Sequence, residues 1–509
     1  SSSLDILDKK LPVIEGNVMF KQLDPWILAA VFLALAIRLF NLDEAALWLD
    51  ETLTLQRIRM AWDEAFLHEL FSGGDANQLP LYFVLLKAWS TVAGTSPLAL
   101  RLPSVLLSLV TVILIARLAG ILISNQAARW AAWLAAVSPY LLHHAQEARM
   151  YPLMSALTAA SIYLLARYLR GDSRKLGAAF VLVNLALLAT HYYSMFIVSA
   201  VLLIPLLLLR RPFKGWLPAI GITGAGVVGV MLMALLIAGR HSGETYDTGF
   251  IAFPGVVWSM ISGYALMPGS EELHALGVRA ALPYLPLALI TVIPLGVIAI
   301  RGLMALNRDA SLLLLVTLAV PLLAPFLVRV IFPDVSINPR YTLPAAPSLL
   351  VLLGAGLAQG FSKRVSVKIS AFVLIAVMLS GSVRHLSTPG HGREDIYAAG
   401  NWLEQHVPVD EEILVTSSEM YHLAIFHWPD RRFRLYPDRK IVVNHQNSAQ
   451  IAENSPFPPS AGRSIFIFGR AWLSDPNGLL RDEFAKRYAI CPGTETRGIR
   501  ILCLEKPAN

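Results

Sequence analysis

Long runs of apolar residues occupy most of this chain and restrict it to a membrane fold. A run of about 17–25 apolar residues can cross the hydrocarbon core of a bilayer, whereas about 10–14 residues usually cannot. The runs that we accept as spans are 25–40, 101–123, 128–142, 150–169, 176–190, 192–209, 216–238, 281–300, 310–332, 341–360 and 367–384. Two of them, 128–142 and 176–190, are short and are expected to extend into their flanks. The sequence thus predicts an α-helical polytopic membrane protein with about 11 transmembrane helices.

Composition supports the membrane class. Hydrophobic residues make up 55% of the 509 residues and charged residues only 15%, against about 25% charged in soluble domains. The net charge is +7, and the basic residues stand in short clusters between apolar runs. Such clusters orient a membrane protein and differ from the basic stripe of a nucleic-acid-binding protein. No nucleic-acid partner is expected.

The orientation depends on Leu79–Gly94, a short apolar segment with Lys87 in its middle. If this segment lies along the membrane surface, the basic clusters between later spans share one side: Arg167 with Arg170, Arg174-Lys175, Arg210-Arg211 with Lys214, Arg301 with Arg308, and Lys363-Arg364 with Lys368. The positive-inside rule makes that side cytoplasmic. Counting Leu79–Gly94 as a span would place every cluster outside, so we predict an interfacial helix.

Three regions follow from this orientation. Residues 1–24 are polar with mixed charge, and no small-residue cleavage site follows the apolar run Asp24–Phe40, so we expect a cytoplasmic segment and no cleavable signal peptide. Residues 25–387 form the transmembrane domain, whose first extracytoplasmic loop is 41–100. Residues 388–509 form a soluble extracytoplasmic α/β domain.

The first outside loop contains apolar residues at helical spacing. These are Leu55, Ile58, Trp62, Phe66 and Leu70, with charged residues between them. The pattern predicts one amphipathic helix on the bilayer surface, followed by a second over Leu81–Val92.

The C-terminal region shows patterns of both helix and strand. Ile396, Ala399, Leu403 and Val407 share one helix face, which Pro408 ends. Strands are predicted at Ile413–Thr416, Ile441–Val443 and Ser464–Phe468, and a hairpin is predicted with arms Tyr488–Cys491 and Ile499–Leu504. Cys491 and Cys503 lie on the two arms and can form either a disulfide or two buried thiols.

Asp50 and Glu51 are adjacent carboxylates just outside the first span. Acids beside an apolar membrane edge are costly unless they are used or paired, and a carboxylate here could act as general base on an acceptor hydroxyl. The alternative is a charge pair that stabilises the N-terminus of the amphipathic helix.

The densest polar cluster is His143-His144-Ala145-Gln146-Glu147-Ala148-Arg149-Met150-Tyr151, which the predicted topology places outside. His143 and Glu147 are four residues apart and would share a helix face, which allows metal ligation. The alternative is an interfacial helix end with a Glu147–Arg149 ion pair.

Outward-facing arginines are exceptions to the positive-inside rule, and three stand near span ends: Arg101, Arg149 and Arg340. A guanidinium binds phosphate through two parallel hydrogen bonds, so such an arginine suits a lipid phosphate. Snorkelling to lipid headgroups is the alternative.

His191 and Tyr192 lie at the outer turn between the fifth and sixth predicted spans, where tyrosine is typical of the aromatic belt. The outer loop 239–280 contains Arg240-His241 and Glu271-Glu272-Leu273-His274, and no pattern defines its role. No Walker loop, dinucleotide fingerprint or zinc-protease motif is present. This argues against an ATP-driven machine and against a nucleotide-sugar donor.

Four motifs follow one another on the predicted outer side. They are Trp48-Leu49-Asp50-Glu51; Gln78-Leu79-Pro80-Leu81-Tyr82 with Leu100-Arg101-Leu102-Pro103-Ser104; Ser138-Pro139-Tyr140 with Gln146-Glu147-Ala148-Arg149-Met150-Tyr151; and Pro339-Arg340-Tyr341 with Pro344 and Pro347. In this order they resemble the GT-C superfamily of membrane glycosyltransferases, in the branch of protein O-mannosyltransferases and the lipid A aminoarabinose transferase. The resemblance covers about residues 25–360, with a weaker likeness in the tail.

The resemblance implies inverting transfer of one sugar from a polyprenyl-phosphate donor, such as an undecaprenyl-phosphate sugar, to a lipid, glycan or protein hydroxyl. It implies a bacterial inner membrane, with the active site and the C-terminal domain in the periplasm. Asp50, with Glu51 beside it, would be the general base, and Glu147 the second acid that orients the acceptor or helps bind a cation.

The resemblance also implies a phosphate site made by Arg340 with Tyr341, joined by Arg101 and Arg149. His143, His144, His191 and Tyr192 are left as acceptor-binding or metal-binding candidates. The family has no fixed histidine pair before its second acid, so a divalent cation stays open as the cofactor.

Two alternative functions remain. One is an oligosaccharide polymerase or ligase that uses a lipid-diphosphate donor. The other is a membrane transporter, which would place charged residues near mid-membrane and show broken or repeated spans. In this sequence the ionisable residues gather at the outer face instead, and no inverted repeat is visible.

Overall fold

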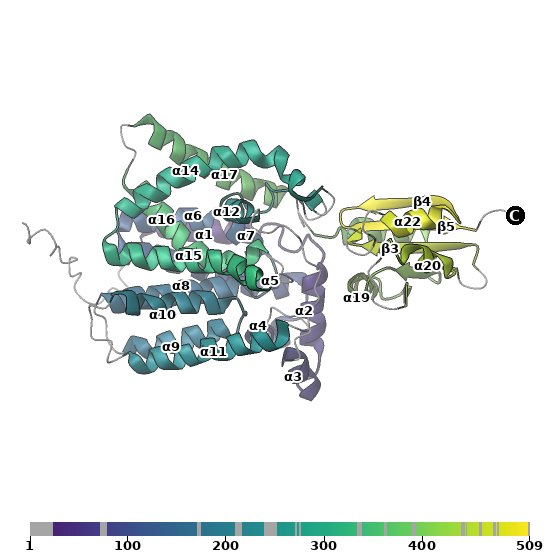
Figure 1. Cartoon of the computed structure of the whole chain (residues 1–509), viewed down its shortest axis with the longest axis horizontal. Helices are drawn as coiled ribbons and strands as arrows, with labels where there is room; N and C mark the ends of the chain where they lie inside the picture. Colours follow the sequence, from purple (N-terminus) through teal and green to yellow (C-terminus); the bar gives the residue numbers. More distant parts are fainter. Residues whose placement is uncertain are drawn as a thin grey trace, which may run out of the picture.

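The computed structural model consists of a helical bundle and a C-terminal sheet domain (Figure 1). The structure describes residues 24–71, 79–170, 175–208, 216–238, 252–269, 272–273, 276–332, 338–360, 364–388, 393–438, 443, 445–457, 461–471, 475 and 478–506. Within these residues, 7 helices are long and apolar enough to cross a membrane. The chain is therefore a multi-pass membrane protein.

Every predicted span overlaps at least one helix of the bundle. The bundle consists of α1 (Pro25–Leu39), α5 (Pro97–Leu122), α6 (Asn125–Ala136), α7 (Pro139–Ala145), α8 (Tyr151–Leu169), α9 (Lys175–Leu188), α10 (Ser194–Leu208), α11 (Leu217–Ala238), α12 (Ala252–Ser262), α14 (Leu285–Met304), α15 (Arg308–Ile331), α16 (Ala346–Ala358) and α17 (Val365–Ser387). Two 3₁₀ segments, η3 (Gly277–Tyr284) and η4 (Pro339–Ala345), precede α14 and α16. Several bundle helices are shorter than a full span, so the total of about 11 spans stays a prediction.

The predicted span 128–142 is wrong as a single helix, because the chain breaks between α6 and α7. Ser138 accepts a hydrogen bond from the Leu141 amide, and Pro139 occupies the first turn, so a new helix starts here. The free carbonyls of Ala135 and Ala136 at the end of α6 accept hydrogen bonds from the buried guanidinium of Arg38 in α1. The break gives the polar residues after Tyr140 a helix of their own.

Close packing of α14 against α16 holds the middle of the bundle together. A Cβ added to Gly302 in α14 would collide with the Leu352 carbonyl, and one added to Gly356 in α16 would collide with the Ile298 carbonyl. Glycines at such contacts allow two membrane helices to approach backbone to backbone.

The first loop forms three helices, α2 (Leu49–Arg59), α3 (Glu64–Phe71) and α4 (Leu81–Ala93). The single amphipathic helix predicted from Leu55 to Leu70 is wrong, since the chain breaks after α2. Lys87 of α4 donates from Nζ to the carbonyls of Ile58 and Met60 and so ends α2. Helix α4 has 13 residues and is therefore about 20 Å long, too short to span a bilayer. This length agrees with the predicted interfacial helix.

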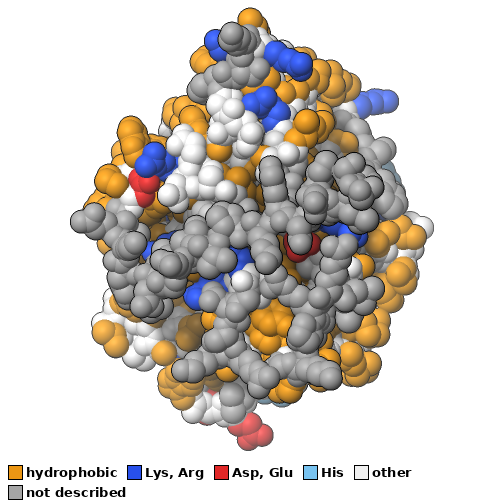
Figure 2. All heavy atoms as spheres, turned by 90° about the vertical axis from the view of Figure 1, so that its left-hand side faces the viewer, with side chains coloured by type: hydrophobic (Ala, Val, Ile, Leu, Met, Phe, Trp, Pro, Cys, Tyr) orange, Lys and Arg blue, Asp and Glu red, His pale blue; other side chains and the backbone are white. Residues whose placement is uncertain are grey.

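At the bundle end opposite the sheet domain, the described side chains include Lys and Arg among hydrophobic ones (Figure 2). The helix connections place Arg170 after α8, Arg308 at the start of α15, and Arg364 before α17 at this end. These arginines belong to the basic clusters that the sequence predicts on one side. Arg210, Arg211, Lys214 and Lys363, together with most of the loop 239–280, lie outside the described residues.

The C-terminal domain is a five-stranded sheet with helices on both faces (Figure 1). Its strands are β1 (Glu412–Val415), β2 (Arg432–Leu435), β3 (Arg463–Gly469), β4 (Ala489–Thr496) and β5 (Ile499–Glu505), in the order β2-β1-β3-β5-β4. The first three strands in this order are parallel, and the last three are antiparallel.

Alternate residues of β1 and β3 enter opposite cores, as strand geometry requires. Ile413 and Ile465 pack beneath α18 (Ile396–His406) and α19 (Ser418–His427). Leu414 and Phe466 pack on the other face, against α20 (Ser448–Glu453) and α22 (Leu479–Ala485). The predicted helix face at 396–407 and the hairpin are confirmed.

Other C-terminal predictions had mixed outcomes. The predicted strand Ile441–Val443 falls almost entirely outside the described residues, and β2 was not predicted. Cys491 and Cys503 lie opposite each other in the β4–β5 register and are joined by a disulfide.

Candidate active site

Two guanidinium groups converge on the carboxylate of Asp50, in the first turn of α2. Arg340 Nη1 lies 3.1 Å from Asp50 Oδ2, and Arg149 Nη2 lies 3.6 Å from the same oxygen. The Asp50 side chain is 17% exposed and that of Arg340 is 25% exposed, whereas Arg149 is buried. The carboxylate is therefore paired but still within reach of a ligand.

Local structure fixes both arginines. Arg149 lies in the turn between α7 and α8, and its Nη1 donates to the Asp50 carbonyl at 3.0 Å and to Thr54 Oγ1 at 3.2 Å. Arg340 lies in η4, where its amide donates to Asn338 Oδ1 and where the Tyr140 hydroxyl donates to the Pro339 carbonyl. The site thus joins segments from three distant parts of the chain.

The charges around Asp50 keep it ionised. Burial alone would raise the pKa of the Asp50 carboxyl, and Glu147 acts in the same direction. The positive charges of Arg149, Arg340 and Arg470 outweigh both, so the pKa lies below its ordinary value. While these pairs persist, Asp50 is a stable anion and a weak base.

Aromatic rings form a platform behind Arg340. Its guanidinium lies 5.6 Å from the Tyr151 ring centroid and 5.7 Å from that of Tyr341, a distance at which a cation is attracted by the ring face. Tyr341 in turn stacks on Tyr193 at 4.4 Å. The predicted role of the neighbouring Tyr192 in acceptor or metal binding stays a prediction.

His191 completes the platform as a neutral ring. Its Nδ1 accepts the Tyr193 amide at 3.1 Å, so the neutral ring carries its proton on Nε2. Burial, with smaller effects of Arg340 and Arg149, lowers the pKa of His191 to about 3. The buried Nε2 has no hydrogen-bond partner among the described residues. The centre of the His191 ring lies 5.6 Å from that of the Tyr341 ring.

Glu51 and Arg101, which the sequence predicts as a catalytic and a phosphate-binding residue, form a buried ion pair with each other. Arg101 Nε and Nη2 hold the two Glu51 oxygens at 2.9 and 2.6 Å. The other N–H groups of Arg101 bind the carbonyls of Leu42, Ala45 and Ala46. All five guanidinium N–H groups are thereby used, and none is left for a phosphate. Both side chains are essentially unexposed, at 1% and 0%.

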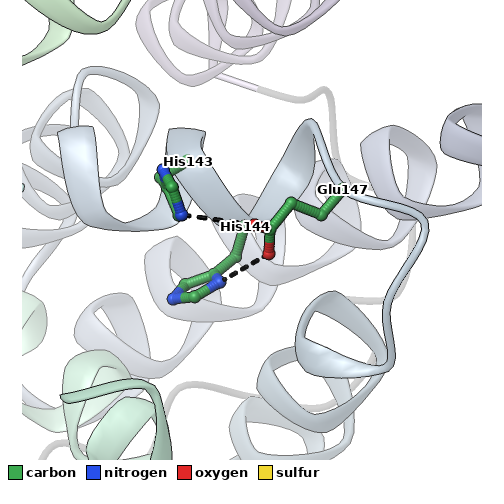
Figure 3. A group of neighbouring side chains, drawn as sticks. All are labelled: His143, His144 and Glu147. Carbon is green, nitrogen blue, oxygen red and sulfur yellow. Dashed lines mark hydrogen bonds and ion pairs between the residues drawn. The ribbon is translucent and has the colours of Figure 1, made fainter. Parts of the chain in front are cut away.

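A second cluster surrounds Glu147, just after α7 (Figure 3). His143 Nε2 lies 3.3 Å from Glu147 Oε1, and His144 Nδ1 lies 3.2 Å from Glu147 Oε2. Burial raises the pKa of Glu147, but His143, His144 and the charge of Arg393 outweigh it and bring the pKa well below its usual value. The Tyr151 ring links the two clusters, because it lies 5.0 Å from His144 and also contacts Arg340.

The donor set of His143, His144 and Glu147 fits a divalent cation such as zinc. One ligand atom from each residue can be chosen so that all three lie within 4.8 Å of one another. The two imidazole contacts run to different oxygens of Glu147, at 3.3 and 3.2 Å, which are also hydrogen-bonding separations. Burial lowers the pKa of His143 to about 4, which keeps this imidazole in the neutral form that a metal requires.

Arg393, at the entry to the C-terminal domain, is a site residue that the sequence did not reveal. Its Nη2 donates to Glu147 Oε1 at 3.1 Å, and its guanidinium lies 5.6 Å from the Trp48 ring. Arg393 and Glu147 are 246 residues apart in the sequence, so no local sequence pattern indicates that they pair. Tyr264, whose hydroxyl lies 3.3 Å from His144 Nε2, was missed for the same reason.

Comparison with known proteins agrees with this architecture. Residues 77–237 match the family model of dolichyl-phosphate-mannose-protein mannosyltransferases. The structure is similar to the crystal structure of ArnT from Cupriavidus metallidurans in the apo state, with 13% identity, a TM-score of 0.54, and coverage of 94% of this chain and 98% of ArnT. No curated protein sequence matches the chain.

A second similar structure is the archaeal oligosaccharyltransferase AglB from Archaeoglobus fulgidus in complex with an inhibitory peptide and a dolichol-phosphate. Here the identity is 12% and the TM-score 0.51, with coverage of 93% of this chain and 73% of AglB. ArnT bound to undecaprenyl phosphate matches at 14% identity and a TM-score of 0.50, with coverage of 94% of this chain and 98% of ArnT.

The fold and the membrane helices define a class, that of multi-pass membrane proteins with the GT-C fold. Within this class, the match to the family model of dolichyl-phosphate-mannose-protein mannosyltransferases covers residues 77–237, less than half of the chain. The resemblance predicted from the four motifs is confirmed.

Proposed function

We propose that this protein is a glycosyltransferase that moves one sugar from a polyprenyl-phosphate donor to an acceptor hydroxyl with inversion. The observation that carries the proposal is the Asp50 carboxylate held between Arg340 and Arg149 beside an aromatic platform. Two guanidinium groups suit a phosphate, and a carboxylate next to them suits proton removal. The matches to ArnT and AglB, which bind undecaprenyl phosphate and dolichol-phosphate in their complexes, support the donor class.

Donor binding would also activate the base. A phosphate that takes hydrogen bonds from Arg340 competes with Asp50 for the same guanidinium, now 3.1 Å from Asp50 Oδ2. Once that contact is lost, one cause of the low Asp50 pKa is removed, and the carboxylate becomes a stronger base. Asp50 would then act only when a donor is present, which limits wasteful hydrolysis.

The transfer step balances as a single displacement. Asp50 takes the proton of the acceptor hydroxyl as the acceptor oxygen forms a bond to the anomeric carbon. The bond from that carbon to the phosphate oxygen breaks on the opposite face, and polyprenyl phosphate leaves with the electron pair. Arg340 and Arg149 stabilise the negative charge that develops on the leaving phosphate.

We infer that the reaction takes place on the periplasmic face of a bacterial inner membrane. The arginines at the bundle end opposite the sheet domain support a cytoplasmic assignment for that end. Asp50, Glu147 and the C-terminal domain lie at the other end.

The substitution Asp50→Asn tests the proposal. It keeps the size of the side chain and removes the base, so sugar transfer should fall by at least about a hundredfold, the usual contribution of a general base. Purified protein in nanodiscs is incubated with a panel of polyprenyl-phosphate sugars and membrane extract, and modified acceptors are identified by mass spectrometry.

The control is Asp43→Asn, at an exposed acid of the same loop, which should transfer sugar at the wild-type rate. Normal transfer by the folded Asp50→Asn protein would contradict the assignment of the base. Transfer of an oligosaccharide from a lipid-diphosphate donor, with none from the monophosphate panel, would replace the proposed function by the polymerase or ligase alternative.

A further inference from the structure

His191 lies in the turn between α9 and α10, and neighbouring segments fix this turn. The amide of Leu81, at the start of α4, donates to the Ala189 carbonyl at 3.1 Å. The amide of Ser194, at the start of α10, donates to the His191 carbonyl at 2.9 Å. The His191 side chain is fully buried. Its imidazole therefore has a defined position, and the mechanism proposed above gives it no task.

The imidazole fixes the backbone at Tyr193. Its Nδ1 accepts a hydrogen bond from the Tyr193 amide at 3.1 Å. A side-chain acceptor two residues before an amide holds the backbone in a turn. His191 thus fixes the segment that carries the Tyr193 ring, just before α10 begins.

The Tyr193 ring supports the platform behind Arg340. It stacks on Tyr341 with 4.4 Å between the ring centroids and an angle of 16° between the ring planes. The His191 ring lies 5.6 Å from Tyr341 and 6.0 Å from Tyr151, separations at which aromatic rings attract each other. These two tyrosines are the rings that lie within 6 Å of the Arg340 guanidinium.

Arg340 depends on this platform once a donor binds. Among the described residues, the single ion-pair partner of its guanidinium is Asp50, and its buried Nε has no hydrogen-bond partner. In the proposed mechanism a phosphate takes the place of Asp50. Of the interactions that the described residues make with this guanidinium, the cation–π contacts with Tyr151 and Tyr341 then remain.

We propose that His191 is a positioning residue that places Arg340 for the donor phosphate. By accepting the Tyr193 amide it holds the stack of Tyr193 on Tyr341, and this stack holds the neighbouring Arg340. The inference rests on the proposed function, because that function makes Arg340 a phosphate ligand. His191 touches neither the donor nor the acceptor and takes no part in proton transfer.

Chemical modification of Arg340 tests this role without sugar transfer. Phenylglyoxal modifies accessible guanidinium groups, and mass spectrometry measures the rate at Arg340 in protein reconstituted in nanodiscs. His191→Phe keeps a ring but removes the acceptor of the Tyr193 amide, so Arg340 should be modified about fivefold faster, as loss of one hydrogen bond predicts. His191→Asn keeps an acceptor for an amide two residues on, so its rate should stay within about twofold of the wild type.

Two other arginines calibrate the measurement. Arg481, whose side chain is 43% exposed, should react at the same rate in every variant. Arg101, whose side chain is 1% exposed, should stay unmodified in folded protein. Faster modification of Arg340 alone therefore separates a local effect from general loosening of the fold.

An unchanged rate at Arg340 in His191→Phe, or an equally raised rate in His191→Asn, would overturn the proposal. If Arg101 is also modified in His191→Phe, the variant is not folded, and the two links are tested separately. Nitrogen-15 NMR of histidine-labelled wild-type protein should then show an unprotonated Nδ1 at His191. Tyr193→Leu should speed modification of Arg340, whereas Tyr163→Leu, at a partly buried tyrosine of α8, should not; failure of either link overturns the proposal.

The modification rates and the transfer assay report separately on the two proposals. Failure of the positioning role leaves the Asp50→Asn result intact, and failure of the proposed function leaves the modification rates intact. In the transfer assay, His191→Phe should raise the KM for the donor about fivefold and leave the KM for the acceptor unchanged. A raised KM for the acceptor with an unchanged KM for the donor would also overturn the positioning role.

Discussion

At the scale of single residues, the contacts of each arginine near Asp50 define its role. All N–H groups of the Arg101 guanidinium donate hydrogen bonds, to Glu51 and to three backbone carbonyls. The Arg340 guanidinium instead contacts a single oxygen of Asp50, and a quarter of its side chain is exposed. The same residue type thus serves as a structural brace in one case and as a candidate phosphate ligand in the other. Exposure and unused hydrogen-bonding capacity separate the two roles.

The substitution Arg340→Ala should weaken the donor site and move the pH profile. The apparent KM for polyprenyl-phosphate sugar should rise about tenfold or more, as loss of a charged phosphate contact predicts. Of the charges that act on Asp50, Arg340, Arg149 and Arg470 lower its pKa and Glu147 raises it. Removing Arg340 therefore raises the Asp50 pKa in the free enzyme, and the acid limb of kcat/KM should shift to higher pH.

Steady-state kinetics across pH measures both effects of Arg340→Ala. Arg340→Lys keeps the positive charge, so its pH profile should lie close to that of the wild type. Its KM should stay raised, because lysine cannot form two parallel hydrogen bonds to a phosphate. An unchanged KM in Arg340→Ala would remove Arg340 from the phosphate site, and an unmoved acid limb would show that Asp50 is not the group that titrates.

At the scale of elements, the break between α2 and α3 shows how a distant side chain overrides local periodicity. The apolar spacing from Leu55 to Phe66 continues without interruption, yet Lys87 binds the last carbonyls of α2 and Asp63 caps α3. The Lys87 ammonium also lies 4.9 Å from the Trp62 ring and 4.8 Å from the Phe66 ring. One buried cation therefore joins the helices α2, α3 and α4.

The substitution Lys87→Met should destabilise this corner. It keeps the aliphatic stem but leaves the Ile58 and Met60 carbonyls without their donor, at a cost of about 2–3 kcal/mol. Thermal unfolding in detergent should show a lower Tm. Lys486→Met, at a lysine whose side chain is 66% exposed, should change the Tm little, and equal Tm values for the two variants would refute the capping role.

At the scale of the whole molecule, the segment 393–395 fastens the sheet domain to the membrane bundle. Arg393 binds Glu147, while Glu394 binds Arg470 and the Asp395 amide donates to the Arg497 carbonyl. The sheet domain thereby places a positive charge beside each site carboxylate, Arg393 at Glu147 and Arg470 near Asp50. These ion pairs, together with the covalent linkage, tie the position of the domain to the site.

The substitution Arg393→Met should therefore lower stability, because it leaves Glu147 buried with only histidine partners. Removing one partner of a buried ion pair costs about 3–5 kcal/mol, visible as a lower Tm and faster proteolysis near residue 393. Adding Glu147→Gln should recover much of the loss, since no buried charge is then left unpaired. Additive effects of the two substitutions would show that the pair is not coupled.

Much of the fold was readable from local patterns. Apolar runs located a helix at every predicted span, strand alternation located β1, β3 and the hairpin, and the hairpin arms brought Cys491 and Cys503 opposite each other. Such patterns act over a few residues, because helix and strand periodicity place side chains relative to near neighbours only. The short strand β2 and the α6–α7 break gave weaker local signals.

The long apolar runs that restrict this chain to a membrane fold were determined by the sequence alone, and so was the gathering of ionisable residues at the ends of these runs. Only the tertiary structure decided which of those residues meet. Asp50 and Arg340 are 290 residues apart, and Glu147 and Arg393 are 246 apart. Pairing over such distances depends on how the helices pack and where the sheet domain docks, which no local periodicity encodes.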